Sequence, residues 1–389
     1  MNWEVSTMPS KRSFFNGTLF RKNLTRFWPL WGGVSLMGAV FPLYVLLSIL
    51  GREYVSYTAR DMGRALYGVV TELVPGFLLV YAALCGVLVW GYLNNSRSVG
   101  LYHSLPVDRT CLYLTTLASG FAMVLIPFVV VGALLCLVCL VTGTLPLLAV
   151  AETALAVVLM AVFYFSTATL AAMVTGNGFA MLAFYAIGHF LAVLLESLVT
   201  AFASGFLFGL TSLSAGVLNF LSPTIYIYEH FKAYYGIWDA SGPDSLQGMW
   251  VIAVYALAGL VLLALSWLLY RRRKSESAGD VVAQWWLKPI FRYVVALCSA
   301  LTLGQLLYEL VYGLPFQEGG YYQLFPMAVC LIITGILGYY AASMLLKKSL
   351  RVFKGDWQGP VTTAAIVVIL CGCDSLDIFG TASYVPETE

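Results

Sequence analysis

Residues 251–274 read VIAVYALAGLVLLALSWLLYRRRK, an apolar run that ends in the basic cluster Arg271-Arg272-Arg273-Lys274. About 20 apolar residues are enough for a helix to cross the hydrocarbon core of a bilayer. Basic side chains resist transfer across the membrane, so the end of this helix is expected on the cytoplasmic side. The stretch therefore predicts a membrane-spanning helix together with its direction.

The rest of the chain repeats this pattern of apolar runs and polar gaps. Hydrophobic residues make up 60% of its 389 residues and charged residues 10%, whereas a soluble domain carries roughly 25% charged residues. The apolar runs begin near Trp28, Val70, Cys111, Leu147, Phe179, Val251, Tyr293, Phe325 and Val361. We therefore expect an all-α integral membrane protein with about nine transmembrane helices.

The 21 Lys and Arg residues are sorted between alternate gaps. One set of gaps holds Lys11, Arg12, Arg21, Lys22, Arg26, Arg97, Arg109, Arg271, Arg272, Arg273, Lys274, Lys288, Arg292, Lys347, Lys348, Arg351 and Lys354. The remaining ones are Arg52, Arg60, Arg64 and Lys232. This asymmetry predicts a cytoplasmic N-terminus and, with nine spans, a C-terminus outside. The inner excess predicts contact with anionic membrane lipids, and its dispersal over separate segments argues against nucleic acid as a partner.

Several motifs that would give the chain its own chemistry are missing from the sequence. It has no G-x-x-x-x-G-K-[ST] nucleotide-binding loop and no G-x-S-x-G nucleophile turn. It has three histidines and no H-E-x-x-H pair, so a zinc site built by the protein is not expected. We therefore expect a membrane subunit rather than an enzyme, with no cofactor or metal bound by this chain.

Three ionisable residues fall within predicted spans. His189 and Glu196 lie seven residues apart in the fifth span and so share one helix face, and Glu309 lies in the seventh span. An ionisable group inside a membrane is a candidate functional group. These residues define a candidate intramembrane polar site, suited to a proton relay. The alternative is that both carboxylates lie near the outer ends of their helices and reach water there.

The polar segment 94–109, NNSRSVGLYHSLPVDR, connects the second and third spans. A simple connection between two helices needs only a few residues. This one is longer and places Leu101, Tyr102 and Leu105 between Arg97 and Arg109. Exposed apolar side chains in a polar connection indicate a surface for a partner protein, with a helix lying on lipid as the alternative. The basic cluster at Arg271, by contrast, is expected mainly to fix topology.

The segment Ser104-Leu105-Pro106-Val107-Asp108-Arg109, followed by Leu112, Tyr113 and Gly120, resembles the inner-loop signature of bacterial ABC transporter permeases of the type-2, exporter-like class. Segments 348–354 and 377–386 resemble a Gram-positive subgroup with extra C-terminal spans and an outer domain. The resemblance implies a location in the bacterial plasma membrane.

The resemblance also implies an organisation in three parts. Residues 1–27 would form a cytoplasmic tail and an interfacial elbow helix. Residues 28–274 would form a six-span permease core with short re-entrant helices near 204–222. Residues 275–389 would contain a cytoplasmic linker and three additional spans, and the sequence would end at the start of an outer domain.

By the same resemblance, the chain would form half of a transport path and would borrow ATP hydrolysis from a separate ABC ATPase subunit, which binds ATP and Mg²⁺. A second permease copy or a paralogue would complete a dimer. The residues that would contact the ATPase are Arg97, Leu101, Tyr102, His103, Ser104, Leu105, Pro106 and Arg109.

Two other functions stay open at this point. The first is a proton-coupled secondary transporter that uses Glu196 and His189, whose transport would continue without ATP. The second is a membrane sensor or scaffold without transport, in which changes to the 94–109 loop would leave transport unaffected.

Overall fold

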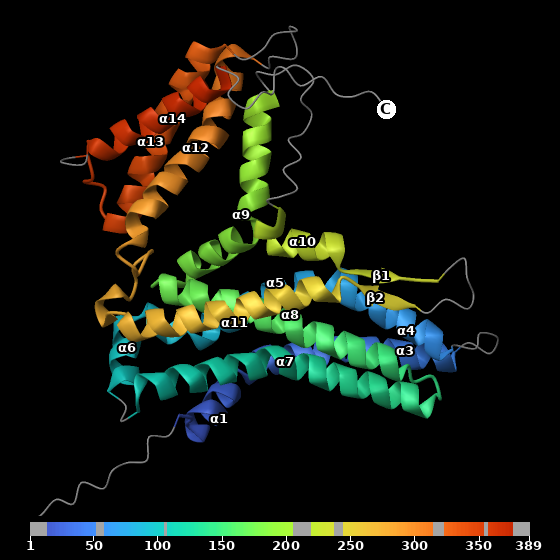
Figure 1. Cartoon of the computed structure of the whole chain (residues 1–389). Coiled ribbons are helices and arrows are strands. Elements are labelled where there is room, and N and C mark those ends of the chain that lie inside the picture. The colour runs from blue at the N-terminus through green and yellow to red at the C-terminus, as the bar shows by residue number, and fades with distance from the viewer. Residues whose placement is uncertain are drawn as a thin grey trace, which may run out of the picture. The chain divides into compact units, whose positions relative to one another are not determined.

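The computed structural model describes residues 14–51, 58–104, 107–204, 219–236, 244–313, 323–353 and 357–375. The first helices are α1 (Gly17–Arg26), α2 (Trp28–Gly38), α3 (Val40–Leu50), α4 (Ala59–Gly68), the π-helical turn η1 (Val69–Leu73), α5 (Val74–Val89), the 3₁₀ turn η2 (Gly91–Asn94), α6 (Ser96–His103), α7 (Arg109–Val141), α8 (Leu147–Val174) and α9 (Gly178–Ser204). The remaining elements are η3 (Asn219–Leu221), α10 (Pro223–His230), β1 (Lys232–Tyr234), β2 (Ser245–Gln247), α11 (Met249–Arg272), η4 (Ser275–Ser277), α12 (Leu287–Tyr312), α13 (Leu324–Lys347) and α14 (Gln358–Ser375) (Figure 1).

Within the described residues, eight helical stretches are long and apolar enough to cross a membrane. They are α2 with α3, α4 with α5, and the single helices α7, α8, α9, α11, α12 and α13. The protein is therefore a multi-pass helical membrane protein, as its composition predicts. The expected ninth span corresponds to α14, whose apolar part, Gln358–Gly372, is shorter. The number nine and the orientation in the membrane stay predictions.

The chain forms two compact units. The first comprises Met1–Ala186 and Pro223–Gly279, and the second comprises Ile187–Ser222 and Asp280–Glu389. The domain boundaries expected from the sequence stay predictions, and most of the expected re-entrant segment, residues 205–218, lies outside the described residues.

The core of the first unit is built around α8. Its side chains Met160, Tyr164 and Phe165 are fully buried, and α8 packs against α5, α7 and α11. α7, α8 and α11 run side by side in Figure 1. Gly120 of α7 has no side chain, and the Phe165 ring packs directly on the backbone there. Burial of these large apolar groups between helices is therefore what joins the spans of this unit.

The connections at one end of the first unit contain structure that the apolar pattern does not predict. Arg60 and Arg64 lie on the helix α4 rather than in a loop, because Thr58 and Asp61 form a capping box at its start. Both arginines hydrogen bond to Asp244 beside the β1–β2 hairpin, at 2.9 and 3.0 Å. These hydrogen bonds, that from Arg60 first, lower the pKa of Asp244, so the carboxylate stays ionised.

In the second unit, α12 and α13 form a close antiparallel pair. Gly304 and Gly338 allow this approach, because an added Cβ would collide with Leu331 and Ser299 respectively. Small residues serve the same purpose between helices in membranes generally. Asp280 lies between Lys288 and Lys348, at 3.4 and 2.9 Å, and so connects the segment before α12 to the residue that follows α13.

A proline inside α7 is matched by a hydrogen bond from a neighbouring helix. Pro127 has no N–H group, so the carbonyl oxygen of Met123 lacks its usual donor within the helix. The hydroxyl of Tyr81 on α5 donates to this oxygen at 2.8 Å, in a buried position. The side chain of Tyr81 therefore satisfies the backbone group that the proline leaves open.

Replacing Tyr81 with Phe is expected to lower the free energy of unfolding by about 1–3 kcal/mol, because the buried Met123 carbonyl would lose its donor. Unfolding of the detergent-solubilised protein by sodium dodecyl sulfate measures this change. Tyr44→Phe is the matched control, since Tyr44 is 64% exposed. Equal stability of the two variants would contradict this role of Tyr81.

Candidate functional site: the loop helix between two membrane helices

The candidate site is centred on α6, which connects the second and third membrane-crossing stretches. The Asn95 side chain begins the helix by accepting a hydrogen bond from the Arg97 N–H at 3.0 Å. At the other end, the Ser104 hydroxyl donates to the Leu101 carbonyl at 2.8 Å. The predicted site residues Leu105 and Pro106 lie outside the described residues, as does the side chain of His103.

The two faces of α6 differ in exposure. Arg97, Leu101 and Ser104 are exposed, with Leu101 at 66%, and they recur at helical spacing on one face. Val99 on another face is 3% exposed, and Tyr102 is half-buried. The helix is thus held to the bundle on one side and presents a polar surface with an apolar centre on the other.

A cluster of aromatic side chains supports the buried face of α6. Tyr102 stacks on Tyr92 with ring centroids 4.4 Å apart, and the Tyr92 and Tyr270 hydroxyls lie 3.1 Å from each other. The Tyr113 ring lies 5.4 Å from that of Tyr270 and 5.4 Å from that of Trp90. Trp90 directly follows α5, and the other residues come from η2, α7 and α11, so the cluster connects α6 to the ends of three long helices.

Arg273 lies beside this cluster and binds the carboxyl ends of other helices. Its side chain is buried and donates to the carbonyl oxygens of Ala172 at 2.7 Å and Met173 at 3.3 Å, in the last turn of α8. It also donates to the Leu93 carbonyl in η2 at 3.3 Å. Carbonyl groups at helix ends lack donors and carry partial negative charge.

Burial lowers the pKa of Arg273 to about 10, which leaves the guanidinium charged at neutral pH. The arginine therefore ties the end of α11 to the end of α8 and to the turn before α6.

Arg109 makes a similar connection at the start of α7. Its guanidinium donates to the Arg271 carbonyl at 3.3 Å, at the end of α11, while the residue itself stays exposed. The contacts of Arg109 and Arg273 gather the carboxyl ends of α8, α11 and η2 and the amino end of α7 at one end of the first unit. Successive membrane-spanning helices run antiparallel, so α7 begins at the same end of the unit at which α8 finishes.

The structure brings some of the predicted loop residues together and separates others. Arg97, Leu101 and Ser104 share the exposed face, whereas Tyr102 faces the aromatic cluster and Arg109 faces α11. Contact of all of them with a partner stays a prediction. The sequence does not single out Arg273, because the basic cluster 271–274 is already explained by its effect on the orientation of the helix in the membrane.

The three ionisable residues of the candidate intramembrane site belong to the second unit. His189 is fully buried on α9, and Glu196 and Glu309 are half-buried on α9 and α12. Seven residues of helix separate His189 from Glu196 by about 10 Å along the axis, so the two cannot hydrogen bond directly. The Gln305 side chain donates to the Leu198 carbonyl at 3.4 Å and so joins α12 to α9 one turn before Glu309.

No family model, no curated protein and no solved structure matches the chain. The resemblance to type-2 ABC permeases thus stands on the residues of the 94–109 loop and the segments quoted with it.

Replacing Arg273 with Met is expected to destabilise the protein by about 3 kcal/mol, because buried helix-end carbonyls would lose a charged donor. It is also expected to loosen α6, so that trypsin cleaves faster after the exposed Arg97. Mass spectrometry of the tryptic fragments measures cleavage at that site.

Arg272→Met is the matched control, since Arg272 is the exposed neighbour of Arg273. Cleavage after Arg97 at the same rate in both variants would show that Arg273 does not hold α6.

Proposed function

We propose that the chain is the membrane-spanning permease subunit of an ATP-binding cassette transporter of the exporter-like class in a bacterial plasma membrane. The observation that supports this most directly is the arrangement of α6. Its exposed face, Arg97, Leu101 and Ser104, is available to a partner, while Val99 and Tyr102 fix the other face on the helix bundle. A simple polar turn between two spans needs no such support.

The connections of α6 suit a part that transmits motion. The stacked rings of Tyr102 and Tyr92 join α6 to η2, the turn that follows α5, and Arg273 joins η2 to the ends of α8 and α11. A force applied to α6 by closure of a partner would reach these helices as a rigid-body shift, since packed interfaces move between discrete states. ATP and Mg²⁺ would be bound by the ATPase partner.

α1 supports the same proposal because it has the features of an interfacial helix that leads into the first span. The Asn16 N–H donates to the Thr115 hydroxyl at 3.0 Å, and the Asn23 side chain donates to the Ser119 hydroxyl at 3.2 Å, which fixes α1 along the first turns of α7. Arg21, Lys22 and Arg26 on α1 are exposed. A helix of this kind rests at the surface of anionic lipid.

The second candidate function is a proton-coupled transporter, and the buried His189 in α9 is the observation that favours it. A proton-coupled transporter needs no nucleotide-binding partner, whereas an ABC permease does. Recovery of the partner therefore distinguishes the two.

The chain purified from its native membrane in mild detergent is expected to carry a nucleotide-binding ATPase subunit. The double variant Arg97→Glu with Leu101→Asp should reduce the recovered ATPase at least tenfold, because it reverses the charge and removes the apolar centre of the exposed face of α6. Immunoblotting of the membrane fraction measures whether insertion is unchanged.

The control is Arg351→Glu with Leu350→Asp, an exposed pair of the same composition in another polar connection. Undiminished ATPase recovery from the α6 variant, or equal losses from both variants, would refute α6 as the docking surface.

A further inference from the structure

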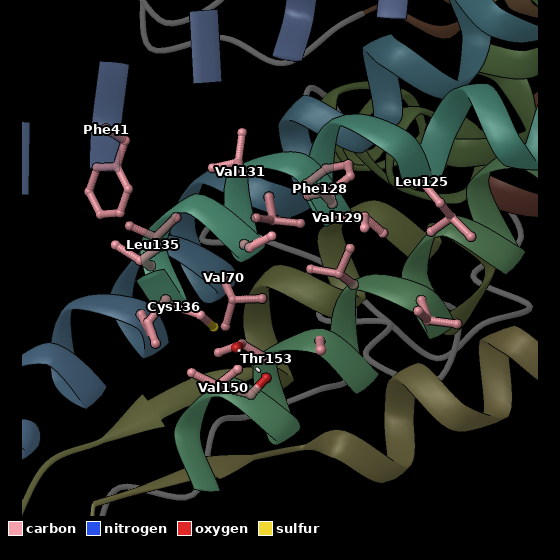
Figure 2. A pocket seen from close by; sticks show the side chains of 18 residues that line it. Phe41, Val70, Leu125, Phe128, Val129, Val131, Leu135, Cys136, Val150 and Thr153 are labelled. Carbon is pink, nitrogen blue, oxygen red and sulfur yellow. Dashed lines mark hydrogen bonds between the residues drawn. The ribbon is translucent and has the colours of Figure 1, made fainter. Parts of the chain in front are cut away.

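The first unit contains a cavity of about 340 Å³ between α3, the α4–η1–α5 stretch, α7 and α8. Figure 2 shows side chains such as Phe41, Val70, Phe128 and Leu135 lining it. Ligand-binding cavities in proteins begin at about this size. The cavity lies toward the α7–α8 connection and away from the end of the unit that carries α6.

The lining gives a polar ligand nothing to bind. Among the described residues around the cavity, Thr153 and Cys136 carry the polar side-chain atoms. The Thr153 hydroxyl already donates to the Ala149 carbonyl of its own helix at 2.7 Å, and a thiol is a weak hydrogen-bonding group. Water enters a cavity when it finds two or more polar partners, so this one is suited to hydrocarbon.

The mouth of the cavity lies between α7 and α8. Val129 and Ala133 on α7 and Ala154 and Val158 on α8 line the cavity and are also exposed, Val129 to 67%. Each pair is four residues apart and so faces one way. These residues lie roughly 10–18 Å from the helix ends at the α7–α8 connection, which is the depth of acyl chains in a bilayer. The opening therefore lies on the side of the helix bundle and faces the acyl chains of the surrounding lipid.

Two irregularities in the helices border the cavity. Val69 and Val70 belong to the π-helical turn η1, and Phe128 follows Pro127 in α7. The Tyr228 hydroxyl fixes the first of these, since it donates to the Glu72 carbonyl at 3.2 Å and accepts from the Gly76 N–H at 2.9 Å. π-Turns inside helices occur often at functional sites. Both irregular segments are anchored by tyrosines, Tyr228 and Tyr81, so the walls are held in place.

We propose that this cavity binds one hydrocarbon chain of a membrane lipid, which enters between α7 and α8 and leaves its headgroup outside. The hydrocarbon fills the space beside apolar atoms that otherwise have no contact partner on that side. The polar edge that a headgroup would meet includes the half-buried Thr142 in the α7–α8 connection, whose hydroxyl lies 2.9 Å from that of the buried Thr144. The proposal does not depend on the ATPase partner.

The test uses the full chain in nanodiscs of phosphatidylglycerol, a fraction of which carries a diazirine at the middle of one acyl chain. Photolysis is expected to label peptides that contain residues 125–136 and 150–158. Gly132→Leu should reduce this labelling at least fivefold, because Gly132 lines the cavity and an added Cβ there meets no atom within 4 Å. Leucine also favours the helix over glycine, so the variant should fold.

Gly33→Leu is the control, since an added Cβ at Gly33 also meets no atom within 4 Å and Gly33 does not line the cavity. Labelling that is unchanged by Gly132→Leu would overturn the proposal. Labelling of α7 and α8 no stronger than that of the exposed lipid-facing residues Leu257 and Val261 on α11 would overturn it as well. If the Gly132 variant is recovered poorly, Ala154→Phe blocks the mouth and is read in the same way.

Discussion

The proposed site depends on the hydrogen bonds that the buried guanidinium of Arg273 donates to backbone carbonyls at the ends of other helices. The guanidinium replaces the missing donors at the carboxyl end of α8 and in the turn η2, at 2.7 and 3.3 Å. A charge in this position would be costly without such partners. The carbonyl of Arg271, two residues earlier, also accepts a hydrogen bond from Arg109. The ends of α8, η2 and α11 and the start of α7 are therefore joined. This framework supports the aromatic cluster and, through Tyr102, the loop helix α6.

The basic residues at this end combine a role in orientation that the sequence predicts with a structural role in joining helix ends. Sorting of Lys and Arg between the two sides of a membrane sets orientation, and Arg273 and Arg109 in addition cap helices that end on that side. The opposite half of the unit contains an apolar cavity. The helices around this cavity are irregular, because one contains the π-helical turn η1 and another contains Pro127. The two halves suit the two proposed tasks, which are contact with a protein partner at one end and binding of a lipid chain in the other half.

Much of the helical framework was predictable because length and apolarity decide what crosses a bilayer. The predicted spans beginning near Cys111, Leu147 and Phe179 correspond to α7, α8 and α9 within two residues. α4 and the β1–β2 hairpin were not predicted, since their stability comes from Asp244 and a capping box rather than from an apolar run. In the candidate site, the pattern indicated the exposed Arg97 and Leu101. The partners of Arg273 are about 100 and 180 residues away in sequence, and only the fold brings them together.

The most direct measurement places a photo-crosslinking amino acid at position 101 in living cells and identifies what it labels. The account predicts an adduct with a nucleotide-binding subunit, because Leu101 lies at the centre of the exposed face of α6. The same probe at Leu350, which is also exposed, should give no such adduct. Adducts from position 101 that contain lipid and no protein would contradict the account.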